Sequence, residues 1–229
     1  MMKKIVLAAA VFGATVAVGG EGGLLADSSA DARPRIAVFG GSFSRIEASR
    51  AAKDVWAKEL GCSVDTYGVN SCGFEAGREK GNDIAGQVAR ALKAGVDYRA
   101  YVLWGSGNDI GFPASATSNG VERAVKLIRD GAPQAKIVLI NSIDEPFQQD
   151  DVRAKIRRCA ESQKGICARL GVPCLDLFNH SGITRENGRA LVSGDDCHMT
   201  AAGYAHIAPL TAGFLRKNTG CAHSKMSGK

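Results

Sequence analysis

Short apolar runs alternate along the chain with segments in which apolar residues recur every three or four positions. The runs have the length of buried β-strands, whereas the segments between them have the spacing of helices packed by one face. Strands that alternate with helices form right-handed βαβ units and therefore a parallel sheet with helices on both faces. The pattern predicts a three-layer α/β/α domain with a five-stranded parallel sheet. The expected strands are Arg35–Phe39, Ser63–Val69, Ala100–Trp104, Lys136–Ile140 and Pro173–Leu177.

The predicted helices lie between these strands and after the last of them. Three are marked by apolar positions around Trp56, Val88 and Val125, and a fourth should cover Asp151–Leu170. A last helix, Ala201–Lys217, is expected to turn Ile207, Leu210 and Phe214 toward the sheet. In such a sheet ligands bind beyond the carboxyl ends of the strands, so we expect the chemistry in the residues that follow each strand.

The segment before the first strand has the organisation of a secretory signal peptide. Lys3 and Lys4 precede an apolar run from Ile5 to Val18, and Ala30-Asp31-Ala32 offers a cleavage site between small residues. The run is shorter than the ~20 residues that a permanent membrane span needs. We therefore expect residues 1–32 to be a signal peptide. Residues 33–229 should be an exported domain, periplasmic or extracellular, without stable membrane insertion.

Charge and composition narrow the classes of partner. The net charge is +6, but the basic residues are dispersed, and the densest group, between Arg153 and Arg158, fits the solvent-facing side of a helix. Aromatic residues make up 6% of the chain, too few to favour a stacking platform for single-stranded nucleic acid. Nucleic acid is therefore not an expected partner.

The chain has seven cysteines, all of them after the expected signal peptide. An oxidising compartment permits disulfides, and the absence of a C-x-x-C pair disfavours a zinc or thioredoxin-type site. Cys62 and Cys72 bracket an extended run that would separate them by ~30 Å, beyond the reach of a disulfide. Cys159 and Cys167 should lie two turns apart on one helix and not pair. The odd number leaves at least one cysteine outside any internal pair.

The first strand ends in Gly40-Gly41-Ser42, a candidate for nucleophilic chemistry. Ser44 and Glu47 form the S-x-x-E pattern of a capping box, which predicts a helix beginning at Ser44 and places Ser42 on the tight turn before it. A simple glycine–serine turn is the alternative interpretation. The spacings of a dinucleotide fingerprint, a P-loop and the G-x-S-x-G elbow are all absent.

Asp195 precedes His198 by three residues, just before the last predicted helix. In a turn, this spacing can bring the carboxylate onto Nδ1 of the imidazole, so that the other nitrogen faces away as a general base. Asp196 is a competitor, and a helix N-terminal turn without catalytic function is the alternative. The remaining histidines lack an Asp at this spacing: we interpret His180, His206 and His223 as loop, helix-surface and tail residues.

Taken together, these segments resemble the conserved blocks of the SGNH (GDSL-type) hydrolases, from the first strand to the last helix. The resemblance rests on four blocks in the family's order. They are Gly40-Gly41-Ser42, Val69-Asn70-Ser71-Cys72-Gly73, Leu103-Trp104-Gly105-Ser106-Gly107-Asn108-Asp109, and Asp195-x-x-His198 followed by Gly203 and Tyr204.

The resemblance implies a flavodoxin-like sheet and a serine esterase that needs no metal or organic cofactor. Ser42 would be the nucleophile, His198 the base, and Asp195 the residue that orients the imidazole. The amides of Ser42 and Gly73 and the side chain of Asn108 would form the oxyanion hole.

Two residues depart from the family pattern. Gly41 replaces the usual Asp before the nucleophile, and Ser106 stands where the G-x-N-D block has Gly. Neither position supplies the nucleophile or the base, so the departures should change loop geometry rather than remove the chemistry. Gly68 and Gly77 compete with Gly73 for the oxyanion role.

The length of the chain leaves little for a lid or an acyl tunnel. A short acyl group, such as acetyl, on an extracellular glycan or a related small polar ester is therefore the expected substrate. The alternatives are a lysophospholipase or thioesterase acting on lipids, and a non-catalytic glycan-binding member of the same fold.

The family's fold also suggests how the cysteines pair. In a flavodoxin-like fold the first and last helices cover one sheet face and run toward its amino edge, so Cys62 and Cys221, which follow them, should meet. Cys72 and Cys197 would lie near the proposed site, and Cys167 and Cys174 flank a helix-to-strand turn. These three pairs leave Cys159 free; the alternative is that several of the cysteines are buried thiols.

Overall fold

The computed structural model describes residues 33–221. Residues 1–32, where the signal peptide is expected, and the C-terminal tail from 222 to 229, which contains His223, lie outside the described residues. Within the described part, no helix is both long and apolar enough to cross a membrane.

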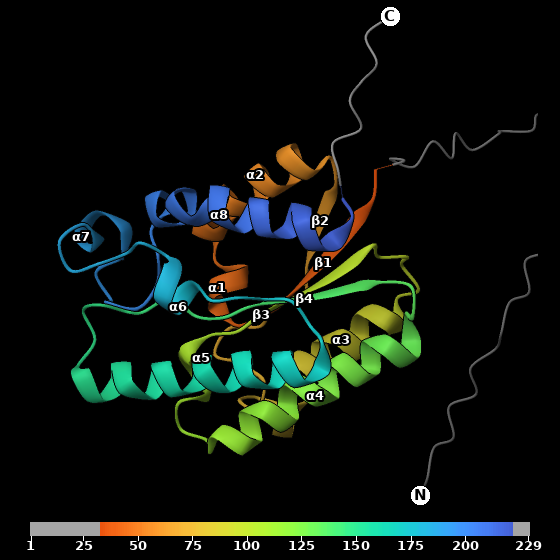
Figure 1. Ribbon diagram of the computed structural model, residues 1–229, viewed down its shortest axis with the longest axis horizontal. Helices are drawn as coiled ribbons and strands as arrows, with labels where there is room; N and C mark the ends of the chain where they lie inside the picture. The colour runs from red at the N-terminus through yellow and green to blue at the C-terminus, as the bar shows by residue number, and fades with distance from the viewer. Residues whose placement is uncertain (1–32, 222–229) are drawn as a thin grey trace, which may run out of the picture. The chain divides into compact units, whose positions relative to one another are not determined.

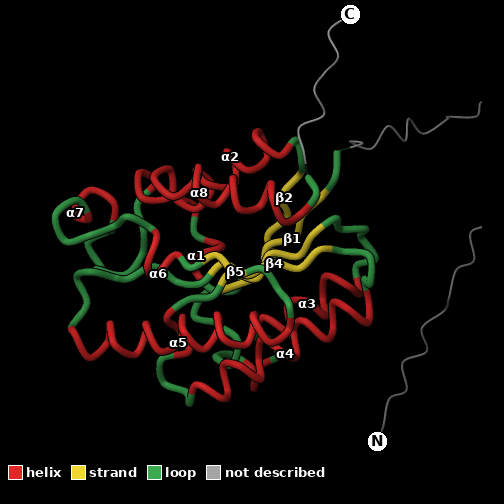
Figure 2. The backbone as a smooth tube through the Cα atoms, in the orientation of Figure 1, coloured by secondary structure: helices red, strands yellow, loops and turns green. Residues whose placement is uncertain are grey.

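Five parallel strands form one sheet in the order β2-β1-β3-β4-β5 (Figure 2). The predicted five-stranded parallel sheet is thus confirmed, and its strand order is that of flavodoxin-like folds. The two edge strands are shorter than expected, because β2 ends at Thr66 and β5 has only two residues. The strands are β1 Arg35–Gly40, β2 Ser63–Thr66, β3 Ala100–Trp104, β4 Lys136–Ile140 and β5 Cys174–Leu175.

Helices cover both faces of the sheet, as Figure 1 shows: α2 and α8 lie on one side, and α3, α4 and α5 on the other. Short helices lie near the ends of the strands. The helices are α1 Ser42–Arg45, α2 Arg50–Leu60, α3 Ile84–Lys93, α4 Ala114–Gly131, α5 Asp150–Leu170, α6 Leu177–His180, α7 Gly188–Leu191 and α8 Ala201–Thr219. The 3-10 turns are η1 Glu47–Ser49, η2 Arg78–Lys80 and η3 Gly107–Asp109.

The core is divided by the sheet into two apolar clusters. Along β1, Ile36 and Val38 face the α2/α8 layer, while Ala37 and Phe39 face the α3/α4/α5 layer. This alternation follows from the two-residue period of a strand buried on both faces. The central strands are therefore fixed in register, and their carboxyl ends lie at one edge of the sheet.

The inward face of α8 differs from the prediction. Leu210 is exposed and Phe214 only partly buried, whereas Ile207, Thr211 and Leu215 are fully buried. The prediction missed this face because its middle position is a threonine. The Thr211 hydroxyl accepts a hydrogen bond from Nε1 of Trp56 on α2 at 2.7 Å, so a polar side chain is satisfied inside the layer.

The segment after β1 also differs from the prediction. A short helix, α1, begins at Ser42 itself, and the predicted capping box at Ser44 does not form. The Ser44 hydroxyl instead donates to the carbonyl of Gly41, three residues earlier in the chain, at 2.9 Å. Ser42 thus lies at the first position of a helix rather than on a turn before one.

All seven cysteines are free thiols in this structure, so none of the three suggested disulfides is present. The Cys221 thiol contributes to the raised pKa of Cys62, and the Cys174 thiol to that of Cys167, so the members of each pair lie close together. The third pair is wrong. The Cys72 thiol lies against Gly77, whereas the Cys197 thiol lies beside Glu145.

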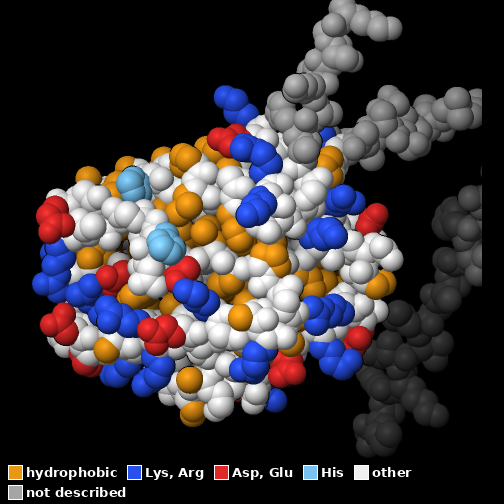
Figure 3. Space-filling view, in the orientation of Figure 1, with side chains coloured by type: hydrophobic (Ala, Val, Ile, Leu, Met, Phe, Trp, Pro, Cys, Tyr) orange, Lys and Arg blue, Asp and Glu red, His pale blue; other side chains and the backbone are white. Residues whose placement is uncertain are grey.

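Charged side chains of both signs are interspersed on the face of the molecule that Figure 3 shows. Several of them pair locally, as Arg153 does with Asp144 at 2.6 Å and Lys155 with Asp151 at 3.1 Å. The basic group predicted to lie on the solvent side of a helix is on α5, where Arg157 and Arg158 are exposed. On this face the basic residues do not form a single continuous patch.

Candidate active site

Ser42 is placed by the end of β1 and by contacts that hold the strand's last residue. The buried side chain of Gln87 on α3 accepts from the amide of Gly40 at 2.8 Å and donates to its carbonyl at 3.0 Å. A methyl group at Gly40 would come within 2.5 Å of the carbonyl oxygen of Trp104 on β3, so only glycine fits there. The peptide before Ser42 is therefore fixed from both sides.

Asp195 and His198 belong to a short loop between α7 and α8. An antiparallel bridge between Val192 and Met199 closes this loop at its base. Thr200 ends it by capping α8, since its hydroxyl accepts from the amide of Gly203 at 3.1 Å. The sequence prediction that a helix begins directly after His198 is confirmed.

The two oxygens of the Asp195 carboxylate have different hydrogen-bond partners. Oδ1 accepts from the Ser193 hydroxyl at 2.5 Å and from the amides of Cys197 and His198 at 3.1 and 2.9 Å, which fixes the loop. Oδ2 lies 2.6 Å from Nδ1 of His198. Asp196, the competitor, pairs with Arg189 at 2.8 Å instead.

The structure brings Ser42, His198 and Asp195 together, although Ser42 and His198 are 156 residues apart in sequence. Nε2 of His198 lies 2.7 Å from Oγ of Ser42. Because an ionised carboxylate only accepts, Nδ1 carries the hydrogen and Nε2 is left as the acceptor for the Ser42 hydroxyl. The arrangement allows proton transfer from a serine hydroxyl to an imidazole.

The charge of Asp195 is stabilised by its surroundings. Partial burial acts to raise the pKa of Asp195, but the hydrogen bonds from His198, Ser193 and the loop amides outweigh it and hold the pKa well below its usual value. A carboxylate that stays ionised can stabilise a positive charge that forms on the imidazole. Ser193, which contributes to this effect, carried no signal in the sequence.

Asn108 lies in the 3-10 turn η3 after β3 and lines the same cleft as Ser42. Its Nδ2 atom donates to the carbonyl of Cys72 at 2.9 Å and to the hydroxyl of Ser106 at 3.0 Å. Both hydrogens of the amide thus have an acceptor in the protein. Ser106, one of the two departures from the family pattern, supplies the hydroxyl that accepts one of these two hydrogens.

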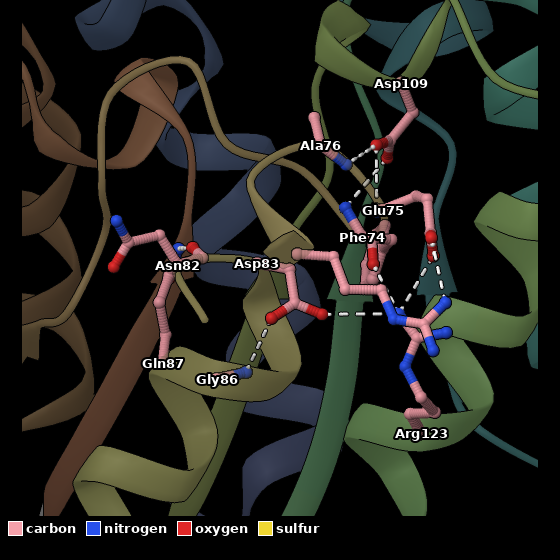
Figure 4. Close-up of polar contacts among 10 residues, drawn as sticks. Phe74, Glu75, Ala76, Asn82, Asp83, Gly86, Gln87, Asp109 and Arg123 are labelled. Atoms are coloured by element: carbon pink, nitrogen blue, oxygen red, sulfur yellow. Dashed lines mark hydrogen bonds and ion pairs between the residues drawn. The ribbon is translucent and has the colours of Figure 1, made fainter. Parts of the chain in front are cut away.

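Gly73 does not point its amide into the site, so its predicted oxyanion role is wrong. The amide donates to the carbonyl of Ala76 at 3.0 Å. This small loop is tightened by the buried carboxylate of Asp109, which accepts from the amides of Phe74, Glu75 and Ala76 at 2.8 to 3.0 Å (Figure 4). Burial raises the pKa of Asp109 even though these hydrogen bonds act to lower it.

The residues of this loop that line the cleft are Asn70 and Ser71. Ser71 has a φ of 58°, which is uncommon for a residue with a side chain. Farther from the site, Arg123 of α4 holds the same loop, because its guanidinium contacts Glu75 at 3.0 Å and Asp83 at 3.3 Å (Figure 4). The sequence located the loop but not the residues within it that face the cleft.

A cleft of about 410 Å³ opens beside Ser42 and His198. Its walls combine apolar side chains, which suit an acyl or alkyl group, with polar ones that suit hydrogen-bonding groups. The lining includes Phe43, Ile46, Ile110, Val152 and Ile156 among the apolar residues, and Asn70, Ser71, Asn108, Glu145 and Gln148 among the polar ones.

The loop between β4 and α5 forms one wall of this cleft, and the sequence analysis did not assign it a function. Gln148 from this loop donates to the carbonyl of Asp196 at 3.2 Å. The guanidinium of Arg189 lies 3.5 Å from the centre of the Phe147 ring. These contacts join the wall to the loop that bears His198. In the sequence, Phe147 and Gln148 are marked only by their position after a strand.

Among residues 33–221, no group of three or more His, Cys, Asp or Glu side chains could hold a metal ion. The other described histidines lie away from the cleft. His180 is the last residue of α6 rather than part of a loop, and His206 is on the exposed side of α8 with Nε2 3.1 Å from the carbonyl of Ser181.

Comparison with known proteins assigns the family. Residues 27–206 match the profile of the GDSL-like lipase/acylhydrolase family. The chain belongs to this family.

A relative of this chain is platelet-activating factor acetylhydrolase IB subunit alpha2 from Gallus gallus. The two are 27% identical over 134 residues, which are 56% of this chain and 58% of the relative. The chain thus spans little more than half the length of that relative.

Solved structures of similar fold include two esterases. A carbohydrate acetylesterase from Sinorhizobium meliloti superposes with a TM-score of 0.63 at 12% identity, over 81% of this chain and 99% of the other. An aryl esterase from M. smegmatis superposes with a TM-score of 0.62 at 14% identity, over 81% and 99% of the two chains. At these identities the likeness concerns the fold.

Proposed function

We propose that the acylhydrolase is a serine esterase in which Ser42, His198 and Asp195 act as a catalytic triad. The observation that carries the proposal is the continuous chain of contacts from Oγ of Ser42 to Nε2 of His198 at 2.7 Å and from Nδ1 to Asp195 at 2.6 Å. The base is within hydrogen-bond reach of both the nucleophile and the orienting carboxylate, as acyl transfer requires.

In the first half-reaction, Oγ of Ser42 attacks the ester carbonyl while its proton moves to Nε2 of His198. Collapse of the tetrahedral intermediate breaks the ester bond, and the imidazolium returns the proton to the departing alcohol. Water then attacks the acyl-serine with His198 again as the base, releasing the carboxylic acid and restoring Ser42. Asp195 stays ionised throughout and stabilises the imidazolium.

The oxyanion would be held by the amide of Ser42, the amide of Ser71 and the side chain of Asn108. The Ser42 amide opens α1 and has no acceptor within that helix. Ser71 takes the place that the sequence analysis gave to Gly73. Asn108 can turn to the oxyanion by releasing Ser106, because a neutral hydroxyl is a weaker acceptor than a developing anion.

As substrate we propose an ester of a short acyl group, such as acetyl, with a carbohydrate or another polar alcohol. The cleft is compact and open, and polar side chains are interspersed among its apolar ones. The similar fold of the carbohydrate acetylesterase from S. meliloti is consistent with this choice. A lipid hydrolase would instead favour long acyl chains.

The experiment is hydrolysis of p-nitrophenyl acetate, butyrate and octanoate by the wild type and by Ser42→Ala. We expect a preference for acetate and a loss of several orders of magnitude in kcat for Ser42→Ala. Ser115→Ala, on the exposed side of α4, is the matched control and should behave as the wild type. A folded Ser42→Ala protein with wild-type rates would disprove the triad, and a preference for octanoate would favour a lipid hydrolase.

We also propose that the protein is exported, on the organisation of residues 1–32 alone. Expression of the full chain in a bacterial host, followed by N-terminal sequencing of the periplasmic and extracellular protein, tests this. Recovery of an uncleaved chain in the cytoplasm only would contradict it.

A further inference from the structure

Glu145 is a buried acid on the wall of the catalytic cleft to which the proposed mechanism gives no task. Its side chain lies on the loop after β4, is 3% exposed and lines the same cleft as Ser42 and His198. Oε1 is packed close to Gly107, and a methyl group at Gly107 would lie 3.1 Å from it. The carboxyl group is therefore held in place rather than free to turn into solvent.

The surroundings of Glu145 supply one weak hydrogen-bond donor and no positive charge. The Cys197 thiol lies beside the carboxyl group, and the charged groups that act on this carboxyl group, Asp195 and Asp144, are both acidic. Glu145 takes part in none of the ion pairs formed within the described residues; Arg153, the cation nearby in sequence, is paired with Asp144. Burial, with these acidic neighbours, raises the pKa of Glu145 to about 7.

A buried carboxyl group of this kind is costly unless a partner satisfies it. The partner that the protein does not provide can come from the bound substrate. A carboxyl group accepts a strong hydrogen bond from a hydroxyl group, and a site built to do so discriminates against an analogue that lacks the hydroxyl.

We propose that Glu145 is a specificity-determining residue that accepts a hydrogen bond from a hydroxyl group of the substrate's alcohol portion. The inference rests on the proposed function, because an acyl group as short as acetyl carries no hydroxyl and so leaves the alcohol to supply it. The substrate class is accordingly the monoacyl esters of polyols or sugars, with a free hydroxyl near the ester bond.

The experiment compares glycerol 1-acetate with 2-methylbutyl acetate. The two esters have nearly the same shape, but the second has alkyl groups in place of the two hydroxyls of the first. Acid release is followed in a pH-stat. The wild type should prefer glycerol 1-acetate by about tenfold or more in kcat/KM. Glu145→Leu should bring the ratio close to one, mainly by raising KM for glycerol 1-acetate.

Two further variants separate recognition from folding. Glu145→Gln keeps an acceptor and should retain part of the preference, and Glu145→Met provides a second apolar variant of similar length if Glu145→Leu does not fold. An unchanged ratio in the apolar variants, equal losses for both acetates, or no preference in the wild type would overturn the inference. Ser42→Ala is read separately: it should abolish hydrolysis of both acetates, so the triad and the role of Glu145 can fail independently.

Discussion

Gly41 and Ser106, the two positions at which the chain departs from its family's motifs, lie against each other. A methyl group at Gly41 would be 3.3 Å from Oγ of Ser106, and it would come within 2.5 Å of both Nδ2 of Asn108 and the carbonyl oxygen of Cys72. The space beside Gly41 is therefore already occupied by the Asn108 amide and its two acceptors. The departures form one local arrangement rather than two independent changes.

This arrangement predicts that the family's residue is not tolerated at position 41. Gly41→Asp should lower both the stability and the activity, because its Cβ would force apart the Cys72 carbonyl and the Asn108 amide. Overpacking of this kind costs ~1–3 kcal/mol, measurable as a lower midpoint in thermal or urea unfolding. Gly165→Ala, at an open position on α5, is the control and should not destabilise the protein. A Gly41→Asp protein as stable and active as the wild type would contradict the crowding described above.

Asn108 should act in the transition state. Asn108→Ala should lower kcat and kcat/KM together by about 10²–10³ and leave KM nearly unchanged, since the oxyanion exists only during the reaction. Ser106→Ala should stay within about tenfold of the wild type, because the Cys72 carbonyl still orients the amide and a neutral hydrogen bond is worth only ~1 kcal/mol. Steady-state kinetics with p-nitrophenyl acetate measure both. An effect of Asn108→Ala on KM alone would make it a substrate-binding residue.

The buried carboxyl group of Glu145 should make stability depend on pH. In the unfolded chain this group loses its proton near pH 4.5, whereas in the folded protein it keeps the proton up to about pH 7. The contribution of this difference to the free energy of unfolding is thus fully present below pH 4.5. It is lost as the pH rises to about 7, by an amount on the order of 3 kcal/mol. Glu145→Gln, which carries no ionisable proton, should escape this loss.

The check is thermal unfolding of the wild type and Glu145→Gln between pH 4 and pH 8.5. The stability of the variant relative to the wild type should increase as the pH rises, and most of this increase should fall between pH 4.5 and 7. Glu122→Gln, at an exposed position on α4, should show no such gain. Parallel curves for the wild type and Glu145→Gln would mean that the carboxyl group ionises normally.

The cysteines give a prediction that differs from the one made on sequence alone. Because the thiols of Cys62 and Cys221 lie close together, as do those of Cys167 and Cys174, oxidation should join these two pairs and leave Cys72, Cys159 and Cys197 as thiols. The bond between Cys62 and Cys221 would close most of the domain into a loop. In the chain-entropy model this would stabilise the folded protein by ~5 kcal/mol. Dithiothreitol should then lower the unfolding midpoint. Non-reducing peptide mapping identifies the pairs, and a bond between Cys72 and Cys197 would contradict the structure.

Much of the architecture was determined by the sequence alone. The apolar runs and the helical spacing between them predicted the parallel sheet, because strands buried on both faces must be apolar and each must be followed by a helix that covers it. The pairing of Asp195 with His198 was also local, since a turn of three residues fixes both side chains. Ser42 was predicted from its position after the first strand and Asn108 from the resemblance of its block to that of the family, and the sheet brings both positions to one edge.

Only the tertiary structure decided the contacts between segments that are distant in sequence. The sequence could not show that the Gly73 amide would donate to the carbonyl of Ala76, or that Asn70 and Ser71 would line the cleft. The path of that loop is set by hydrogen bonds that its amides donate to the distant Asp109 carboxylate. Nor could it show Glu145 in the cleft. A glutamate after a strand reads as a solvent-exposed residue until the elements around it are packed, and burial, which gives this carboxyl group its chemistry, is a property of the folded chain.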